Sequence, residues 1–255
     1  MSLSSPEVQK PYSKVIEFKG SLDKGKFYYY DKSLGDDVRD KNVEVPYPLK
    51  FIVLDQLNAI SGFNENAKKG IYSNMIRSIK LEDLVVKCDG GIIGVGKYHE
   101  IQDSVKARGG KFTKMVFAAM ATDDGLEMVL LKLSGGAMAA WFDFQKKNSS
   151  HLTSAGVIVK DECVKAKKGS NVYLVPTFRL LEIKAETMKV AIEMDKGLQK
   201  YLKDMFQKDR EEDVVVTDID ADGDTFLDGV EYEDKMTATL PDTDLGKKDD
   251  DDLPF

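Results

Sequence analysis

The strongest constraint on the fold of this 255-residue chain is the uneven distribution of its charge. Of the chain's 44 acidic and 37 basic side chains, residues 209–255 carry eighteen and four, a net charge of −14. Residues 1–208 carry the remaining 26 acidic and 33 basic side chains, a net charge of +7. A segment as acidic as 209–255 cannot bury enough apolar surface to offset the entropy lost on ordering. The sequence therefore predicts a folded, basic domain over residues 1–208 and a disordered acidic tail over residues 209–255.

Cysteine and histidine are scarce in the chain. Cys88 and Cys163 are too few for a disulfide framework, and His99 and His151 lie too far apart for the usual zinc site. No apolar run approaches the roughly 18 residues that a membrane-spanning helix needs. The first residues lack the basic and apolar regions of a secretory signal. The sequence therefore predicts a cytoplasmic protein without membrane association, metal or cofactor.

Residues 1–208 indicate a mainly β structure with added helices, of the α+β class. Strand patterns cover residues 15–19, 26–31, 49–54, 84–87, 92–95, 112–121, 127–133, 157–164 and 173–181. Helical patterns cover residues 98–108, 135–147 and 185–207. Residues 36–42 and 61–73 are polar and indicate loops, and the second of these carries Phe63 and Tyr72.

The order of the middle elements indicates a particular architecture. One strand, a hairpin over residues 84–95, a helix and two further strands follow one another in the order of an OB-fold. That fold is a five-stranded Greek-key barrel with a helix between its third and fourth strands. The N-terminal hairpin, and the hairpin and helix that follow Ser134, would be additions to the barrel.

The segment Gly91–Lys97 has the glycine and lysine spacing of a phosphate-binding P-loop. The next residue should be Ser or Thr, whose hydroxyl holds magnesium, but it is Tyr98. The apolar residues between the glycines favour a strand of a curved sheet instead. A nucleotide hydrolase that uses Gly91–Lys97 is therefore kept only as an alternative, which an ATPase assay with a Lys97→Ala control would test.

A second motif, Asp218–Gly223, opens like the calcium-binding loop of an EF-hand. The bidentate Glu expected at the twelfth position is replaced by Gly229, so the motif predicts at most weak cation association over Asp218–Asp224. No nucleophile signature or other catalytic constellation is visible in the sequence. We therefore expect a protein that is not an enzyme.

The last seven residues of the sequence combine a run of acidic side chains with an aromatic residue. Its last residues are Asp249, Asp250, Asp251, Asp252, Leu253, Pro254 and Phe255. The proline restricts the backbone and so reduces the entropy lost on docking. The phenyl ring can fill a small apolar pocket, and the four carboxylates attract a basic surface over a distance. This pattern predicts a short peptide motif to which partner proteins bind. The alternative is an acidic tail that only increases solubility.

This ending resembles the C-terminal tip of bacterial single-stranded DNA-binding proteins, in which an acidic run precedes an apolar residue, Pro and Phe. In its length, and in lacking a linker rich in Gln, Gly and Pro, the chain is more similar to the phage proteins of this kind. Those proteins combine an OB-fold with an acidic tail. The segment Phe63–Arg77, with Ile71–Asn74 inside it, also looks like a segment of the phage proteins.

The resemblance implies sequence-independent binding of single-stranded DNA during DNA replication, recombination and repair, in the host cytoplasm if a bacteriophage encodes the chain. It implies that the acidic tip recruits replication or recombination proteins such as a polymerase, primase, helicase or nuclease. It also implies that the tail competes with DNA for the basic domain. A homodimer is compatible with all of these expectations.

Proteins that bind single strands combine aromatic faces that stack bases with basic side chains that follow the phosphates. The aromatic candidates are Tyr28, Tyr30, Phe63 and Tyr72. The basic candidates are Lys26, Lys68, Lys69, Arg77, Lys111 and Lys114, and the tip of the last hairpin adds Lys165, Lys167 and Lys168. For the two tyrosines at 28 and 30, ordinary strand packing is an equally good interpretation.

An acidic-tailed replication scaffold or DNA mimic that does not touch nucleic acid is the main alternative function. A mobility-shift experiment with a fluorescent oligonucleotide would separate the two hypotheses. If the first is right, removal of residues 209–255 is expected to tighten single-strand binding. Removal of Phe255 is expected to abolish partner recruitment and to leave DNA affinity nearly unchanged.

Overall fold

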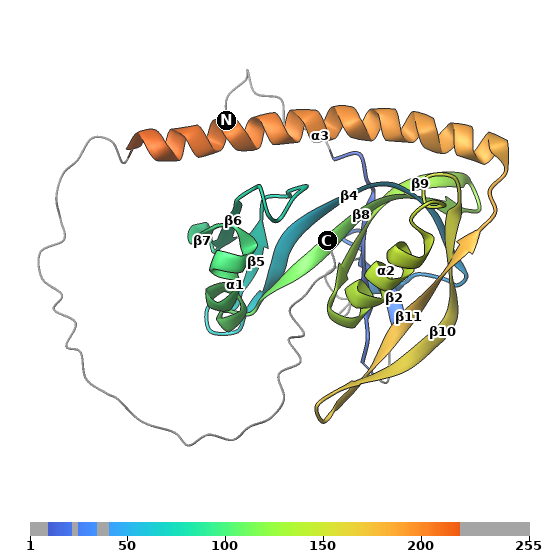
Figure 1. Ribbon diagram of the computed structural model, residues 1–255, viewed down its shortest axis with the longest axis horizontal. Helices are drawn as coiled ribbons and strands as arrows, with labels where there is room; N and C mark the ends of the chain where they lie inside the picture. The colour runs from blue at the N-terminus through green and yellow to red at the C-terminus, as the bar shows by residue number, and fades with distance from the viewer. Residues whose placement is uncertain (1–9, 22–24, 35–40, 220–255) are drawn as a thin grey trace, which may run out of the picture. The chain divides into compact units, whose positions relative to one another are not determined.

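A computed structural model describes residues 10–21, 25–34 and 41–219 of the chain (Figure 1). The strands are β1 (Lys14–Lys19), β2 (Lys26–Tyr30), β3 (Asn42–Glu44), β4 (Leu49–Asn64), β5 (Lys69–Ser73), β6 (Leu84–Cys88), β7 (Gly91–Gly96), β8 (Gly110–Thr122), β9 (Gly125–Ser134), β10 (Gly156–Lys168) and β11 (Asn171–Leu181). The helices are α1 (Tyr98–Ala107), α2 (Gly135–Asn148) and α3 (Ala185–Ile219). The predicted class, mainly β with added helices, is confirmed.

The chain divides into two units, Met1–Gln207 and Lys208–Phe255. All contacts described below lie within the first unit. The backbone of α3 continues to Ile219, past the end that the sequence predicts for this helix at residue 207. The predicted disorder of the acidic tail falls on residues outside the described ranges, apart from those that α3 includes.

The described strands form one mixed sheet, in which β10 and β11 branch from a main path. The order along that path is β3-β2-β1-β9-β8-β4-β5-β6-β7, and β10 pairs with the first residues of β4 and with β11. Strands β1 and β9 run parallel to each other, whereas the neighbouring pairs β1–β2 and β8–β9 are antiparallel. The predicted hairpins at β1–β2, β6–β7, β8–β9 and β10–β11 are all present.

The predicted closure into a barrel is absent from the described residues. A closed barrel requires the two ends of the sheet to pair, so that no free edge remains. Here β9 pairs with β8 on one side and with the added strand β1 on the other, and β7 ends the path. The sheet is therefore open, because a strand from the N-terminal hairpin occupies the edge of β9.

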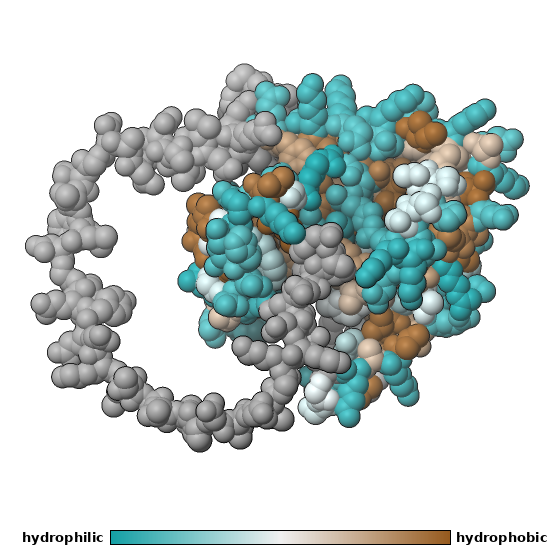
Figure 2. Space-filling model, viewed as in Figure 1, coloured by the Kyte–Doolittle hydropathy of each residue, from teal (hydrophilic) through white to brown (hydrophobic). Residues whose placement is uncertain are grey.

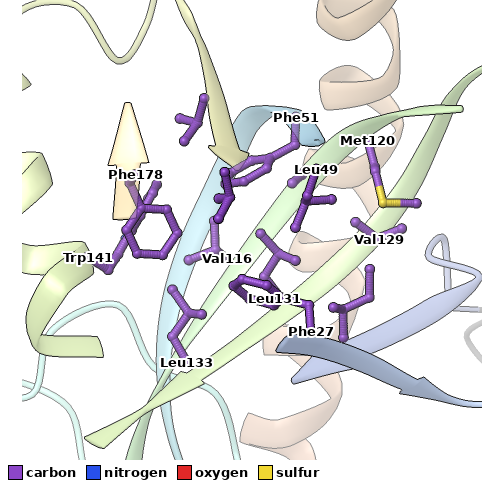
Figure 3. Packing of buried hydrophobic residues seen from close by; sticks show 14 of the residues in the cluster. Phe27, Leu49, Phe51, Val116, Met120, Val129, Leu131, Leu133, Trp141 and Phe178 are labelled. Atoms are coloured by element: carbon purple, nitrogen blue, oxygen red, sulfur yellow. The ribbon is translucent and has the colours of Figure 1, made fainter. Parts of the chain in front are cut away.

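One face of the sheet is covered by α2 and the β10–β11 hairpin, which enclose a hydrophobic core (Figure 3). Trp141 of α2 is fully buried, and its ring centroid lies 5.0 Å from that of Phe178 and 6.1 Å from that of Phe51. The indole N–H donates to the side-chain oxygen of Gln56 at 3.0 Å, so this burial leaves the donor paired. Trp141 is therefore a residue of the hydrophobic core.

The opposite face of β4, β8 and β9 is covered by α3. Leu198 and Leu202 lie four residues apart, and therefore on one side of the helix, where they pack with Leu57 of β4 and Phe117 of β8. Neighbouring residues of β8 point to opposite faces, and Val116 accordingly belongs to the core under α2. Because both faces are covered at the middle of these strands, the open surface of the sheet lies at their ends and on the flanking strands.

The polar segment at residues 61–73 is not the loop that its composition indicates. Residues 61–64 complete β4 and residues 69–73 form β5, so that only residues 65–68 make the turn between them. The segment pairs as strands because Ile60 and Ile71 are buried on one side, while its polar and aromatic side chains occupy the other. The polarity of the segment thus marks an exposed face of a hairpin.

Candidate nucleic-acid interface

The β4–β5 hairpin presents two aromatic rings on one face of the sheet. Ser61 lies opposite Tyr72, and Phe63 lies opposite Gly70. Opposite residues share a face and side chains alternate along a strand, so Phe63 and Tyr72 project from the same face. The two residues are 47% and 52% exposed, which leaves both rings accessible from solvent.

Two lysines lie on the strands that flank these rings. Ser61 is also opposite Lys111 of β8, and Tyr72 is also opposite Lys87 of β6. Lys87 in turn lies opposite Ile92 of β7, so one row of side chains crosses five strands. We call this surface the hairpin face, formed by Ser61, Phe63, Tyr72, Lys87, Ile92 and Lys111. Neither lysine has an ion-pair partner within the described residues.

Apolar side chains continue the hairpin face onto the edge strand. Ile92 and Val95 of β7 are both about half exposed, and Val95 lies opposite Val85 on the face that carries Lys87. Figure 2 shows a hydrophobic patch at the position of β7, bordered by hydrophilic side chains. The surface therefore combines apolar and aromatic contact area with two cationic groups.

The opposite side of the hairpin is packed, and this packing holds the hairpin face in place. Ile71 of β5 and Val86 of β6 are buried there, together with Ile101 and Val105 of α1. Gly94 lets α1 approach β7, since a Cβ at this position would lie 3.4 Å from Val105 and 3.8 Å from Ile101. The strands that carry Phe63 and Tyr72 are thus held in position by the hydrophobic packing on their other face.

A groove of about 530 Å³ adjoins the hairpin face where β4, β8, β9 and β1 end. It is lined by Glu17, Phe18, Ser61, Gly62, Phe63, Glu65, Gly109, Lys111, Lys132 and Ser134. The two glycines in this lining, Gly62 and Gly109, allow the backbone of β4 to approach the backbone that precedes β8. A Cβ at Gly62 would lie 2.2 Å from the carbonyl oxygen of Gly109, and Gly109 has a φ of +96°. A side chain at either position would therefore displace backbone that borders the groove.

The predicted residues of β2 lie on the same side of the sheet as the groove. Lys132 is opposite Glu17, and Glu17 is opposite Tyr28, so the three share one face. Tyr30 follows two residues later on that face and is 57% exposed. Lys26 of this strand donates to Glu44 at 2.5 Å, so its charge is already partnered.

Two predicted lysines at the hairpin turn also have carboxylate partners. Lys68 has a positive φ of 54° and pairs with Glu65 at 2.9 Å. Lys69 pairs with Asp89 at 2.9 Å, and the hydrogen bond that its ammonium donates to this carboxylate raises the pKa of Lys69. Exposed pairs of this kind contribute about 0–1 kcal/mol, so a competing phosphate can displace them at little cost.

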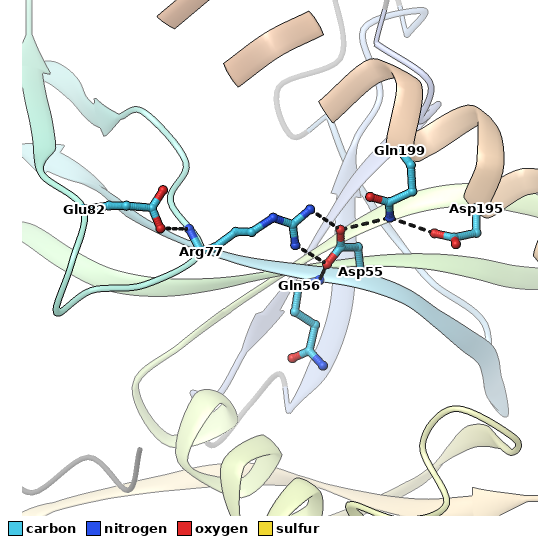
Figure 4. A network of polar contacts seen from close by, with 6 residues as sticks. All are labelled: Asp55, Gln56, Arg77, Glu82, Asp195 and Gln199. Carbon is cyan, nitrogen blue, oxygen red and sulfur yellow. Dashed lines mark hydrogen bonds and ion pairs between the residues drawn. The ribbon is translucent and has the colours of Figure 1, made fainter. Parts of the chain in front are cut away.

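Arg77 is part of a polar network that joins the β5–β6 connection to β4 and α3 (Figure 4). Its guanidinium donates to both carboxylate oxygens of Asp55, at 3.1 and 2.9 Å. Gln199 of α3 donates to the same carboxylate at 3.0 Å. Burial alone would raise the pKa of Asp55, but these hydrogen bonds hold it below its ordinary value. Arg77 therefore has a structural partner and is not free for phosphate.

Lys114 lies on the face of β8 opposite to Lys111. Its ammonium donates to the side-chain oxygen of Asn58 at 3.1 Å and lies 5.9 Å from the ring centroid of Phe142 in α2. Burial lowers the pKa of Lys114. The structure thus separates two lysines that the sequence analysis places in one site.

Lys165 and Lys167 are exposed near the tip of the β10–β11 hairpin, and the backbone of Lys168 ends β10. Close to this tip the hairpin is attached to the β1–β2 hairpin, because Leu174, which lies opposite Lys165, donates its backbone N–H to the carbonyl of Gly20 at 2.8 Å. Within the described residues, neither Lys165 nor Lys167 contacts the hairpin face.

Of the two other motifs in the sequence, the structure describes Gly91–Lys97 but not most of Asp218–Asp224. Gly91–Gly96 is strand β7, paired with β6, and Lys97 binds Asp83 at 3.2 Å. The backbone N–H of Lys97, at the start of α1, donates to Glu100 at 2.9 Å. The predicted interpretation of the glycines as a strand is confirmed. The calcium-loop motif Asp218–Asp224 lies outside the described residues beyond residue 219, and the described part holds no metal-ligand cluster.

Comparison with known proteins identifies no relative. No family model matches the chain, and no curated protein or solved structure matches it. Among the described residues, none of the helices is both long and apolar enough to span a membrane.

Sequence reasoning missed Lys87, Ile92 and Lys132. The signal for Lys87 was its position next to Val86 in a predicted strand, because alternation exposes one residue when it buries the next. The signal for Lys132 was similar, since it stands between the buried Leu131 and Leu133. Each lysine interrupts an apolar run at a strand position that faces solvent.

Proposed function

We propose that the protein binds single-stranded DNA without sequence preference, through the hairpin face, during replication, recombination or repair. The observation that carries the proposal is the placement of Phe63 and Tyr72, half exposed on one face of the sheet between Lys87 and Lys111, which have no ion-pair partner among the residues that the structure describes. Phe63 and Tyr72 are diagonal neighbours across β4 and β5, and clustered exposed apolar groups of this kind mark interaction sites.

The chemistry of this surface suits an unpaired strand. Bases stack on aromatic rings with about 1–3 kcal/mol each, and stacking tolerates every base because each has a π-face. Lys87 and Lys111 flank the row of Ser61 and Tyr72, where they can contact phosphates on either side of a stacked base. Duplex DNA keeps its bases stacked on one another, so this surface favours single strands.

The connectivity of the central strands supports an OB-type core for this function. β4 pairs with β5 and β8, the hairpin β6–β7 precedes α1, and β8 pairs with β9. In OB-folds, oligonucleotides bind on the face of the second and third strands and on the loop after the first strand. The hairpin face corresponds to that surface, and the departure from the fold is that β9 pairs with β1 and leaves β7 at the edge of the sheet.

The acidic C-terminal tip suggests a second activity, the recruitment of partner proteins. We propose that Asp249–Phe255 recruits replication or recombination proteins, because an acidic segment with an aromatic ring fits a basic surface with an apolar pocket.

The decisive experiment measures binding of fluorescein-labelled dT12 by anisotropy at low salt, with Tyr72→Ala and Phe63→Ala as test variants. Each substitution is expected to weaken binding by about fivefold or more, which corresponds to the loss of one stacked base. Leu81→Ala is the matched control, because Leu81 is an exposed apolar residue in the β5–β6 connection, outside the strands that carry the hairpin face. Absence of binding by the unaltered protein would exclude the proposal.

A scaffold that docks proteins on the same surface is the second candidate, and the half-exposed Ile92 and Val95 favour it. The two functions differ in one measurable respect. A protein-docking face would leave dT12 unbound in dilute buffer, whereas a single-strand binder would bind it and lose affinity steeply with salt.

A further inference from the structure

The groove beside the hairpin face leads across the sheet toward β2. Phe63 and Lys111 belong to the groove as well as to the hairpin face, and Lys132 and Glu17 form its other side. Glu17 lies directly opposite Tyr28 of β2, on the same face. On the basis of the proposed function, we infer that one nucleic-acid strand runs from Tyr72 through this groove to Tyr28, which forms a second stacking station.

The carboxylates on this route are already neutralised. Glu17 accepts a hydrogen bond from Lys132 at 2.7 Å, and Glu44, opposite Tyr28, is paired with Lys26 at 2.5 Å. A phosphate that passes along the groove therefore meets paired glutamates together with Lys111, whose charge has no partner within the described part of the chain. The route is open to a polyanion even though acidic residues line it.

Tyr28 has the surroundings of a stacking residue with a phosphate contact beside it. The ammonium of Lys19 lies 4.9 Å from the centroid of the Tyr28 ring. The ring is only partly buried, and Tyr30 extends the aromatic surface on the same face. A base can thus replace the lysine over the ring while the ammonium moves to the adjoining phosphate.

The sheet sets the length of this route. Five steps between neighbouring strands separate β5 from β2, by way of β4, β8, β9 and β1. At about 4.8 Å for each step, the route measures about 24 Å along the sheet. A trinucleotide stacked at about 3.4 Å per nucleotide covers about 10 Å, and even at twice that spacing it falls short of the full route. Twelve nucleotides at about 3.4 Å each cover about 40 Å, which is longer than the route.

The test compares the full-length protein with Tyr28→Ala, on dT12 by anisotropy and on dT3 by fluorescence titration. Tyr28→Ala is expected to weaken dT12 binding about fivefold to 100-fold and to leave dT3 binding unchanged, since dT3 occupies the hairpin face alone. Tyr72→Ala is expected to weaken both. Tyr28→Phe is the matched control, because it keeps the ring and should retain affinity.

A second variant tests the same station without altering β2, in case Tyr28→Ala disturbs the folding of that strand. Lys19→Ala removes a charge and no ring, and it is expected to reduce the slope of log affinity against log salt for dT12 by about 1. If Tyr28→Ala and Lys19→Ala both leave dT12 binding unchanged while Tyr72→Ala weakens it, the route ends before β2 and the inference is wrong. If the unaltered protein ignores dT12, the proposed function itself fails.

Discussion

Lys111 and Lys114 stand three residues apart on β8 and illustrate how one register decides the role of a side chain. Lys111 faces the groove, whereas Lys114 points to the other face, where Asn58 and Phe142 surround it. The sequence identifies both as basic residues of a strand and thus as equal candidates. Which face is open depends on α2 and α3, which come from distant parts of the chain, so the local pattern cannot separate the two lysines.

The first prediction uses this pair as its own control. Lys111→Ala is expected to weaken dT12 binding and to lower the salt slope by about 1, because one phosphate contact is lost. Lys114→Ala is expected to leave the salt slope unchanged and to lower stability, since it removes the partner of a buried Asn58. Anisotropy at several salt concentrations and urea unfolding measure the two effects. Equal salt slopes for the two variants would contradict the assignment of faces.

The long strand β4 shows at the scale of an element what the sequence could and could not predict. Its first residues, 49–54, have a clear apolar pattern, and the strand is present there as predicted. A bulge between Val53 and Asp55 then shifts the register. Before the bulge, Phe51 faces the core under α2, whereas after it Leu57 faces α3. The alternation of buried and exposed residues therefore changes phase at the bulge, and the sequence pattern does not predict the rest of the strand.

The same bulge positions the contact by which α3 is held to the sheet. Asp55 follows it directly, with a side chain that is only 14% exposed, and receives hydrogen bonds from Arg77 and Gln199. Separate hydrophobic contacts of α3, through Leu198 and Leu202, cover the apolar surface. The sequence predicted the amphipathic helix but not this network, because its members come from three distant segments.

The second prediction concerns the charge of Asp55. Asp55→Asn is expected to lower the free energy of unfolding at pH 7 by about 1–3 kcal/mol, because hydrogen bonds to a charged group are lost. The pKa of Asp55 is held below its ordinary value of 3.8, so the ionised carboxylate stabilises the fold above that pH. This stabilisation is lost as the pH falls through the pKa of the folded state. Urea unfolding from pH 7 downward should therefore show a smaller loss with acid for Asp55→Asn than for the unaltered protein, and parallel curves would contradict the role of the network.

The whole molecule combines a sheet with covered central strands and an acidic C-terminal segment. The sequence predicted the division of charge, since composition alone carries it, and it predicted the mixture of strands and helices. It did not predict that β1 runs parallel to β9 and leaves the sheet open, because pairing between residues more than 100 positions apart leaves no local pattern. The position of the groove, formed by β1, β4, β8 and β9 together, follows from that pairing and was equally inaccessible.

The last prediction tests the competition between acidic tail and DNA that the charge division implies. Residues 220–255 carry thirteen acidic and three basic side chains, a net charge of −10, and a stop after Ile219 leaves the whole of α3 in place. The truncated protein is expected to bind dT12 about tenfold more tightly at low ionic strength, because a tethered polyanion no longer competes for the lysines. The advantage should shrink as salt screens both interactions.

Deletion of Phe255 alone is the matched control, since it removes the aromatic ring and keeps every acidic side chain of the tail. Its affinity for dT12 should equal that of the unaltered protein at each salt concentration, because competition depends on charge. The same deletion is expected to abolish capture of a polymerase or nuclease from the same replication system in a pull-down. An unchanged or weaker affinity after truncation at Ile219 would show that the tail does not compete with DNA, and would leave the hairpin face to be judged by its own variants.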